Sequence, residues 1–552
     1  MGRHPLLLCL FAVALWGGPA WLCPPPCQCF GNTAVFCSEE SLWDVPEGIP
    51  PNTTQLLFAE TSLDSIPSRA FANSSALRKL LFLGSPIRSL GEAAFVGLPD
   101  LQELEISDSQ LSAVTAGNLL GLANLSKLSI TFSPIGGLEA GLFENTPGLE
   151  ALHLQGNQVE SLPFDLFRPL ARLETLSLSQ NRLAELPERV FEPLQLLRVL
   201  RLSDNPLPGL PPRLFTPLAG LQELFLEGNG LVELPAGILS PLRHLKRLHL
   251  QHNALVRLQP SAFASLHRLA FLNLDSNQLV ELPEGLFRGT PHLLQLSVAH
   301  NRLQMVPEGL FGHLCNLTML VLSHNHLRHL PAGLLGGLPA LSRLQLSHNN
   351  LSVLPREAFA NLTGLEALDL AHNQLLSLPE GIFNSNEVLF NVALQGNPWA
   401  CDCHLAHVAE WLRYTETPLN AQALCRSPAH LKGWSLPGLQ AEQLTCRREP
   451  GASRCRAEAP GPLGEPQCTY EDPAGAIQLA CDSENCHQLS LCLPREAALP
   501  GPGQRFSRDW TLDSACGTAR LRITVSIETV EPLHGGEAGP AGTTAPAPEE
   551  SP

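Results

Sequence analysis

Leucines recur along most of the chain at fixed intervals that end in an asparagine. The spacing is L-x-x-L-x-L-x-x-N, as in Leu149, Leu152, Leu154 and Asn157. Each asparagine lies 24 residues after the previous one, as far as Asn397. Successive side chains of a strand point to opposite faces, so the leucines of L-x-L share one face of a short strand. The pattern predicts parallel strands that stack their leucines into one continuous core.

The same phase extends toward the amino terminus, where smaller residues replace the asparagine. Thr61, Ser85, Ser109 and Ser133 occupy its position. Together with eleven asparagines, these four positions define fifteen repeats, which we place at residues 51–397. An asparagine amide both donates and accepts, so it can satisfy backbone groups where the chain leaves the strand, and a hydroxyl can do part of this.

A column of aromatic residues repeats with the same period. It predicts buried packing between repeats rather than a binding site, because stacked units share a core. Leucine takes the position at 119, 239 and 335, and the phenylalanines are Phe71, Phe95, Phe143, Phe167, Phe191, Phe215, Phe263, Phe287, Phe311, Phe359 and Phe383.

Cysteines gather at both ends of the repeats, and their motifs resemble known caps. The first group has the spacing C-x3-C-x-C-x7-C, and the second follows Asn397 as N-P-W-A-C-D-C. Both resemble the caps of extracellular leucine-rich-repeat proteins, so we expect caps at residues 21–50 and 398–446. The fold expected is an α/β-type solenoid, a horseshoe with parallel strands on its concave face. The disulfides that the resemblance implies are Cys23–Cys29, Cys27–Cys37, Cys401–Cys425 and Cys403–Cys446.

The amino terminus predicts secretion. Arg3 and His4 precede an apolar run, and small residues follow at Gly17, Gly18 and Ala20. This is the arrangement of a secretory signal, which we place at residues 1–20. No later apolar stretch reaches the roughly 18 residues of a membrane span, so a soluble extracellular protein is expected. Six N-glycosylation sequons agree with this route; they begin at Asn52, Asn73, Asn124, Asn316, Asn350 and Asn361.

The chain beyond the second cap divides by composition. Residues 447–467 are rich in Pro, Gly, Glu and Ala and predict a linker. Residues 468–531 predict a small disulfide-bonded β-rich module, with an alternating strand around Leu521 and Ile527. Residues 532–552 predict a disordered tail. The pairing of seven cysteines stays open: Cys315, Cys455, Cys468, Cys481, Cys486, Cys492 and Cys516.

Neither charge nor motifs indicate an enzyme or a nucleic-acid-binding protein. The formal net charge is −17 and the pI is near 5.6, which disfavours nucleic acid as a partner. No G-x-S-x-G, H-E-x-x-H or P-loop motif occurs. His407 and Glu410 have the spacing of two zinc ligands, but they lie in the expected cap helix without a catalytic domain around them. We therefore expect no catalytic residue, no metal site and no cofactor.

A row of histidines precedes four of the repeat asparagines. His300, His324, His348 and His372 should stack at strand spacing of about 5 Å, with His252 nearby. Such a row could bind a metal ion or respond to pH. Ser-His-Asn is also a common surface filler in these repeats, and we interpret the row in that way.

Residues between the strand leucines should form the exposed concave face, where a partner would bind; they include Phe225, His249 and Phe271. Phe225 and Phe271 flank a patch of mixed charge in the middle of the arc. Aromatic and arginine side chains in polar surroundings are typical of the residues that give protein interfaces their affinity. The candidate partner-binding residues are Phe225, Phe271, Arg201, Glu223, Glu227, Arg247 and Asp275.

Motifs in the last hundred residues resemble the regulatory subunits of carboxypeptidase N. They include Cys468-Thr469-Tyr470, Trp510 and the strand that ends at Glu528. With the caps and the repeat register, the resemblance runs from the first cap to the tail. It implies a non-catalytic, glycosylated plasma protein that binds, stabilises and retains in circulation the zinc-bearing catalytic subunit. That enzyme removes C-terminal Lys and Arg from peptides, and the resemblance implies a tetramer of two catalytic and two regulatory subunits. The alternative is a free extracellular adhesion or receptor-like protein that binds another ligand.

Overall fold

The chain forms two units, Met1–Cys446 and Arg447–Pro552. The predicted signal peptide, linker and tail (residues 1–20, 447–467 and 532–552) lie outside the described residues. The computed structural model describes residues 23–31, 33–414, 423–446, 468–471, 477–481, 504–515 and 518–529.

The first unit is built on one 17-stranded sheet. Strands β1 and β2 pair antiparallel, and each later strand lies parallel to the one before it. A second small sheet pairs β4 (Ser65–Ile66) with β6 (Ser89–Leu90). The strands of the large sheet are β1 (Cys27–Phe30), β2 (Ala34–Cys37), β3 (Gln55–Ala59), β5 (Lys79–Leu83), β7 (Glu103–Ser107), β8 (Lys127–Thr131), β9 (Ala151–His153), β10 (Thr175–Ser177), β11 (Val199–Arg201), β12 (Glu223–Phe225), β13 (Arg247–His249), β14 (Phe271–Asn273), β15 (Gln295–Ser297), β16 (Met319–Val321), β17 (Arg343–Gln345), β18 (Ala367–Asp369) and β19 (Asn391–Ala393).

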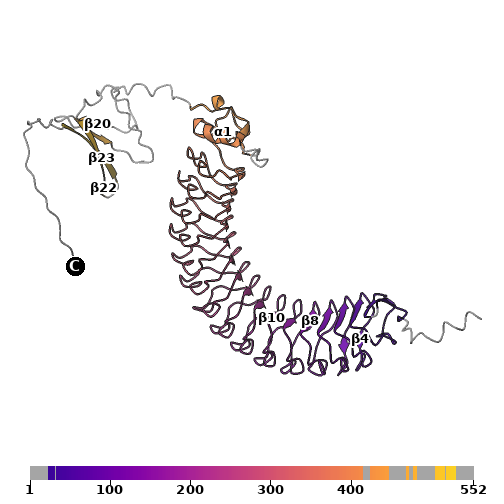
Figure 1. Cartoon of the computed structure of the whole chain (residues 1–552). Coiled ribbons are helices and arrows are strands. Elements are labelled where there is room, and N and C mark those ends of the chain that lie inside the picture. Colours follow the sequence, from indigo (N-terminus) through magenta and orange to yellow (C-terminus); the bar gives the residue numbers. More distant parts are fainter. Residues whose placement is uncertain are drawn as a thin grey trace, which may run out of the picture. The chain divides into compact units, whose positions relative to one another are not determined.

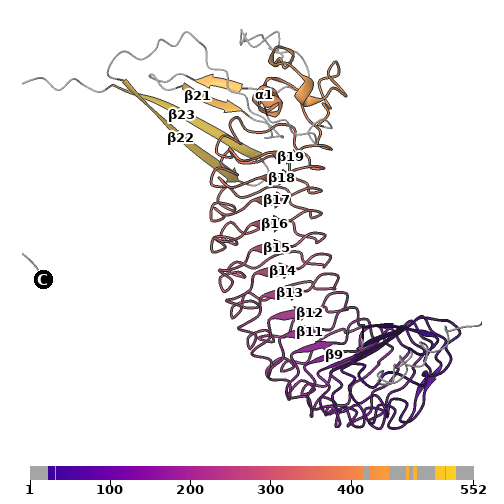
Figure 2. The ribbon, with the colours of Figure 1, turned by 45° about the vertical axis from the view of Figure 1, so that its right-hand side comes forward.

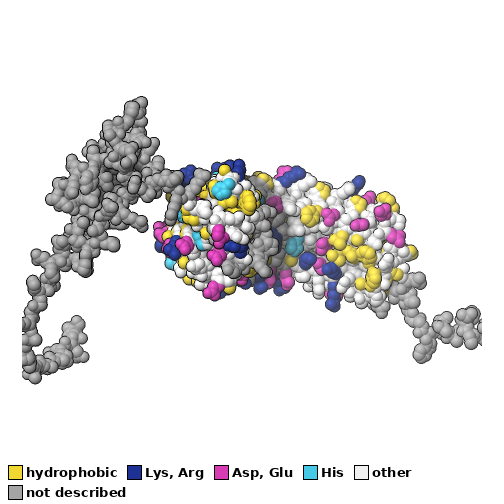
Figure 3. All heavy atoms as spheres, turned by 90° about the horizontal axis from the view of Figure 1, so that it is seen from above, with side chains coloured by type: hydrophobic (Ala, Val, Ile, Leu, Met, Phe, Trp, Pro, Cys, Tyr) yellow, Lys and Arg dark blue, Asp and Glu magenta, His cyan; other side chains and the backbone are white. Residues whose placement is uncertain are grey.

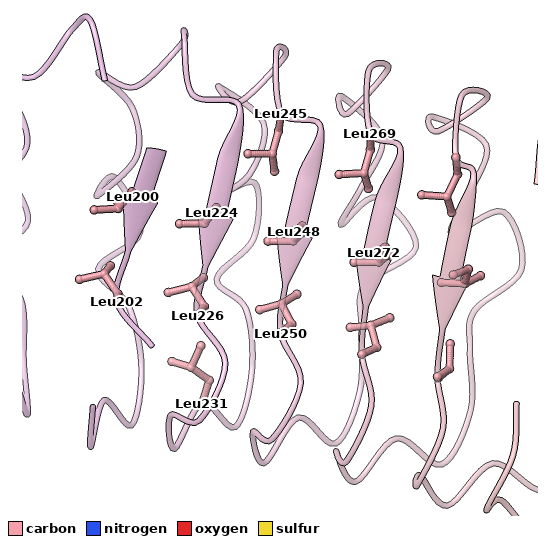
Figure 4. Close-up of a cluster of buried hydrophobic side chains, with 14 of the residues drawn as sticks. Leu200, Leu202, Leu224, Leu226, Leu231, Leu245, Leu248, Leu250, Leu269 and Leu272 are labelled. Carbon is pink, nitrogen blue, oxygen red and sulfur yellow. The ribbon is translucent and has the colours of Figure 1, made fainter. Parts of the chain in front are cut away.

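The strand leucines form the core in the predicted register. Leu200, Leu224, Leu248 and Leu272 are direct neighbours on adjacent parallel strands, and each is 0% exposed. Figure 4 shows these leucines and those two residues further on as repeated rows inside the repeats. The aromatic column is buried too, and its rings stack between repeats, as in Phe263 and Phe287 at 6.2 Å between centroids. The predicted leucine-rich-repeat solenoid is confirmed.

The repeats of the first unit follow a curved path (Figure 1). The strands lie side by side along the stack, from β9 to β19 in Figure 2. Every strand of three residues buries its central side chain, while the flanking positions are mostly half-exposed. This alternation produces a face whose composition is free to vary, because its side chains are not needed in the core.

A left-handed backbone recurs at the residue before the repeat asparagine. The turn here requires a positive φ, which glycine adopts freely and Asn, Asp and His adopt more readily than most residues. Glycine takes the position at Gly84, Gly156, Gly228 and Gly396. The other residues with positive φ at this position are Glu60, Asp108, Phe132, Gln180, Asp204, His252, Ser276, His300, His324, His348 and His372.

Disulfide-bonded caps close both ends of the sheet. The bonds are those that the cap resemblance implies: Cys23–Cys29, Cys27–Cys37, Cys401–Cys425 and Cys403–Cys446. In the second cap, the fully buried Trp399 covers the last repeat and donates from Nε1 to the Leu394 carbonyl at 2.9 Å. The helices of this cap are η1 (Cys403–Leu405), α1 (Ala406–Tyr414), η3 (Leu436–Gly438) and η4 (Ala441–Gln443).

The second unit contains a four-stranded antiparallel sheet in the order β20, β21, β23, β22. The predicted alternating strand lies in β23, and Cys468 is opposite Cys481 in the register of β20 and β21. Cys455, Cys486, Cys492 and Cys516 lie outside the described residues. The bounds are β20 (Cys468–Glu471), β21 (Ile477–Cys481), β22 (Gln504–Ala515) and β23 (Thr518–Thr529).

Candidate partner-binding face

Five of the candidate residues lie on neighbouring strands, at the positions that face away from the leucine core. The other two, Glu227 and Asp275, follow β12 and β14 by two residues. Phe225 is opposite Arg201 on one side and His249 on the other. Phe271 belongs to the adjacent row, where its neighbours are Arg247 and Gln295. The two phenylalanines are therefore not in one row, and both are half-buried, although the sequence predicts them to be exposed.

His249 joins the two phenylalanines into one aromatic cluster. Its ring lies 4.4 Å from the ring of Phe225 and 4.7 Å from that of Phe271, centroid to centroid. The guanidinium carbon of Arg201 lies 3.9 Å from the Phe225 centroid, in the position of a cation–π contact. We name Arg201, Phe225, His249 and Phe271 the central stack. It is held together by side chains of the concave face alone, so it presents a preformed surface of aromatic and cationic groups.

The sequence identifies His249 as a concave residue but not as the link between the phenylalanines. The link depends on a diagonal contact between strands that are one repeat apart, and repeat spacing alone does not reveal the side-chain rotamers. The sequence nevertheless contains a sign of this contact. His249 follows Phe225 by one repeat and precedes Phe271 by 22 residues, which places the three side chains close together on neighbouring strands.

Charged residues surround the central stack. Arg247 Nε lies 3.9 Å from Glu223 Oε1, and both side chains are substantially exposed. Asp275 Oδ1 accepts hydrogen bonds from Ser297 Oγ and from the Ala299 amide, each at 2.6 Å. Glu227 Oε2 is buried, and no donor among the described residues bonds to it. The candidate residues are thus brought together, with Asp275 and Glu223 already paired and one Glu227 oxygen buried without a donor among the described residues.

The environment of His249 keeps this imidazole neutral. Burial lowers its pKa to about 4 from an ordinary 6.5, and the positive charges of Arg247 and Arg201 act in the same direction. Its Nε2 is buried and has no hydrogen-bond partner among the described residues. A neutral ring packs between two phenylalanines at less cost than a charged one, which accounts for the stack at neutral pH.

A second concave feature, which the sequence interpretation missed, lies at the amino-terminal end. Phe36 is opposite Leu57, and Leu57 is opposite Leu81, so apolar side chains occupy three adjacent strands. Together with Phe30 they line a shallow hollow of about 420 Å³. Figure 3 shows hydrophobic side chains gathered on this part of the unit. The sequence contains a sign of this hollow: Leu57 and Leu81 each lie between a buried strand leucine and a buried strand phenylalanine, where the next two repeats have Glu105 and Ser129.

An ion-pair row borders this hollow. Glu103 on β7 lies between Lys79 and Lys127 of the flanking strands, with N–O distances of 2.8 and 2.5 Å. Burial alone would raise the pKa of Glu103, but hydrogen bonds and charge attraction from Lys127 and Lys79 outweigh it and lower the pKa.

His407 and Glu410 lie on the cap helix α1, as the sequence predicts. His407 Nε2 is 3.0 Å from the Pro379 carbonyl oxygen, so a structural contact engages this ring. Among the described residues, the group with metal-like spacing is Cys403, His404 and Cys446, and its two cysteines form a disulfide.

All six predicted glycosylation asparagines are exposed. Asn124 and Asn316 donate to carbonyls of the preceding repeat, those of Pro99 and Pro291, at 2.9 and 3.0 Å. Glycosylation at the six positions stays a prediction. In the part of the chain that the structure describes, no helix has the length and apolar character to cross a membrane. Cys315, whose pairing was open, is exposed and free.

A leucine-rich-repeat family model matches the chain over half of its length. Its six overlapping matches run without a gap from residue 123 to residue 398. They cover residues 123–183, 171–231, 224–279, 243–303, 291–351 and 339–398.

The resemblance to the regulatory subunits of carboxypeptidase N is confirmed, but over a limited segment. Carboxypeptidase N subunit 2 of the mouse is 42% identical over 165 residues, and the human protein is 45% identical over 160 residues. These matches cover 27% and 26% of this chain. They span 30% and 29% of the relatives, less than a third of their length. The matched part is much shorter than the cap-to-tail extent that the motifs indicate.

Among solved structures, the Drosophila Toll–Spatzle complex contains a chain of similar fold. It superposes with a TM-score of 0.58 at 20% sequence identity. The superposition covers 82% of this chain and 74% of that one. At this identity the similarity establishes the fold alone.

Proposed function

Because this chain belongs to the leucine-rich-repeat family, we propose that it is a non-catalytic extracellular scaffold whose concave face binds a protein partner. The observation that supports this most directly is the central stack of Arg201, Phe225, His249 and Phe271. Protein interfaces obtain much of their affinity from aromatic and arginine side chains near their centre. Here such side chains lie together on a face that the core does not require.

The partner that we propose is the catalytic subunit of carboxypeptidase N. The similarity to carboxypeptidase N subunit 2 supports this choice, because that relative is named as a subunit of the enzyme. We propose further that two copies of this chain hold two catalytic subunits. In this arrangement the chain supplies stability and retention in plasma, and the peptidase chemistry belongs to the partner.

Secretion and glycosylation belong to the same proposal. The two disulfide-bonded caps favour an oxidising compartment, where such bonds form and persist. The exposed sequon asparagines are accessible for glycosylation. Both features suit a protein that circulates in plasma.

The alternative is a free extracellular receptor-like protein that binds a different ligand. It is favoured by the short extent of the match to carboxypeptidase N subunit 2, which leaves most of this chain unmatched. Concave surfaces of solenoids bind many kinds of partner, so the fold alone does not select one.

A capture experiment separates the two functions. The purified chain is immobilised, and the catalytic subunit of carboxypeptidase N is passed over it at fixed salt. Saturable binding, together with slower thermal inactivation of the catalytic subunit, supports the scaffold function. The isolated chain should not cleave C-terminal Lys or Arg substrates, with or without zinc. Absence of binding, while plasma proteins of another kind are retained, would favour the receptor-like alternative.

A further inference from the structure

The four predicted histidines form a continuous stack on the surface of the repeats. Adjacent rings of His300, His324, His348 and His372 have centroid distances of 4.0, 4.0 and 4.3 Å. Their interplanar angles are 12°, 12° and 23°, so the rings are close to parallel. All four side chains are exposed. The rings are closer than the spacing of about 5 Å expected from strand separation.

The stack follows from the left-handed turn that these residues share. Their φ values lie between 52° and 54°, so each side chain leaves the backbone in the same direction. Because the repeats keep a constant register, the same orientation recurs one strand further on. Four nitrogen-bearing rings are thereby held in one row by the backbone, without support from the core.

The ring nitrogens of this row are available as ligands. Within the described residues, no hydrogen bond or ion pair engages the imidazole nitrogens of the four histidines. Partial burial lowers the pKa of His324 and of His348, and neighbouring histidines lower it further, against the opposing charge of Asp369. These two rings are therefore mainly neutral at pH 7.4, and a neutral imidazole has the lone pair that binds metal ions.

We propose that adjacent histidines of this row bind a transition-metal dication such as Cu²⁺, Zn²⁺ or Ni²⁺. Metal–nitrogen bonds of about 2.0–2.1 Å in a tetrahedral arrangement place two ligand nitrogens about 3.3 Å apart. In the stack, the in-plane lone pairs of neighbouring rings are nearly parallel, and the rings are 4.0 Å apart at their centroids. To share one ion, each ring of a pair turns out of the stack toward the other by about half the tetrahedral angle, which the exposure of these side chains allows. Water completes the coordination, because two rings supply two ligands.

The nitrogen ligands of the row determine which metal ions it should prefer. Nitrogen ligands suit Cu²⁺, Zn²⁺ and Ni²⁺, and Cu²⁺ binds most tightly in the usual series for divalent ions. Mg²⁺ and Ca²⁺ prefer oxygen ligands and should not bind to the row. Protonation competes for the same lone pair, so binding should weaken as the pH falls toward 5.5.

The chain contains a matched control in His252. It occupies the same turn position, is exposed and has a φ of 56°. One repeat away on either side are Gly228 and Ser276, so no imidazole is adjacent to it. His252 thus reproduces the backbone, the exposure and the chemistry of a row member, but it lacks the neighbouring ring.

Calorimetric titration of the full chain with Cu²⁺ or Zn²⁺ at pH 7.4, in a buffer that does not bind metals, tests the proposal. The variants are H324A/H348A, which leaves His300 and His372 too far apart to share an ion, and H252A. We expect the double variant to lose at least tenfold in affinity and H252A to match the unaltered chain. Thermal melting monitored by circular dichroism confirms that each variant is folded.

Three results would overturn the proposal. The first is an absence of Cu²⁺ and Zn²⁺ binding to the unaltered chain. The second is an unchanged isotherm for folded H324A/H348A. The third is an equal loss of affinity in H252A, or equal binding of Mg²⁺, since either would indicate non-specific association.

Discussion

Asn253 donates from its Nδ2 to the carbonyl oxygen of Leu226, 27 residues earlier in the chain, at 2.9 Å. The same amide nitrogen contacts the Leu250 carbonyl at 3.1 Å, and its Oδ1 accepts from the Leu231 amide at 3.1 Å. Asn253 itself is only 8% exposed. One side chain therefore satisfies buried backbone groups in two successive repeats.

Replacing Asn253 with Leu should lower the free energy of unfolding by about 1–3 kcal/mol, because buried backbone donors and acceptors lose their partners. Ser109→Ala should cost less. The Ser109 hydroxyl contacts Ser133 Oγ at 2.8 Å and accepts from the Leu111 amide at 3.3 Å, so fewer groups depend on it. Urea midpoints followed by circular dichroism provide the comparison. Equal shifts for the two variants would contradict this account of the asparagine position.

The sequence predicts the solenoid well because each repeat must bury the same side chains. The side chain of a strand leucine such as Leu248 must point into the core, and the 24-residue register determines which leucines lie beside it on the adjacent strands. The ladder of asparagines was predictable for the same reason, since its chemistry depends on position and residue type alone.

Features that depend on side-chain rotamers are harder to predict from the sequence. The sequence places His249 on the concave face, but its contact with Phe271 crosses from one row to the next. The contact of adjacent histidine rings at 4.0 Å required the left-handed turn, which the sequence interpretation did not include. The apolar hollow around Leu57 and Leu81 was missed because two further leucines beside the strand leucines do not stand out in a leucine-rich sequence.

Glu103→Gln should destabilise the first unit slightly, by less than about 1 kcal/mol, because Lys79 and Lys127 are both well exposed and their attraction is screened. The lowered pKa of Glu103 means that its contribution is present above the ordinary pKa of 4.5 and is lost as the pH falls through the folded-state value. Glu105→Gln is the control, since its contact with Lys127 is longer, at 3.9 Å. Thermal melting should be measured at low salt and at 0.5 M NaCl, where the Debye length is on the order of a few ångströms. The destabilisation caused by Glu103→Gln should be smaller at the higher salt concentration. A salt-independent loss would indicate a packing role instead.

Acidification should destabilise the repeats partly through His249. Its folded-state pKa is about 4, below the ordinary 6.5, so the unfolded chain takes up a proton first as the pH falls. The stabilisation that neutral His249 contributes to the fold is therefore fully present above pH 6.5 and is lost progressively as the pH falls to about 4. Because the ring is only half-buried, we expect a loss of about 1–2 kcal/mol rather than the full equivalent of the shift. Urea unfolding of His249→Gln across this range should show a flatter pH dependence, and an identical slope would contradict the assignment.

The last prediction concerns the central stack as the partner-binding site. Changing both Phe225 and Phe271 to Ala should weaken binding to the carboxypeptidase N catalytic subunit by about thirtyfold, equivalent to about 2 kcal/mol. The interface would lose two aromatic groups, each able to bury roughly 150–250 Å². His249 would also lose the two rings that hold its imidazole in place, at 4.4 and 4.7 Å. Both phenylalanines face away from the leucine core, so the melting temperature should change little.

Gln295→Ala combined with Thr175→Ala is the matched control for this double variant. Gln295 is opposite Phe271 on the next strand, and Thr175 lies on the same face toward the amino-terminal end. Neither side chain is aromatic or charged, so the control removes no anchor of the kind that the central stack supplies and should retain the affinity of the unaltered chain. Surface capture at fixed salt gives the dissociation constants, and melting curves exclude unfolding. If the double phenylalanine variant is folded and binds as tightly as the control, the contact must lie elsewhere. The apolar hollow around Leu57 and Leu81 is then the next surface to alter, because it offers the other group of apolar side chains that we find on the concave face of the described repeats.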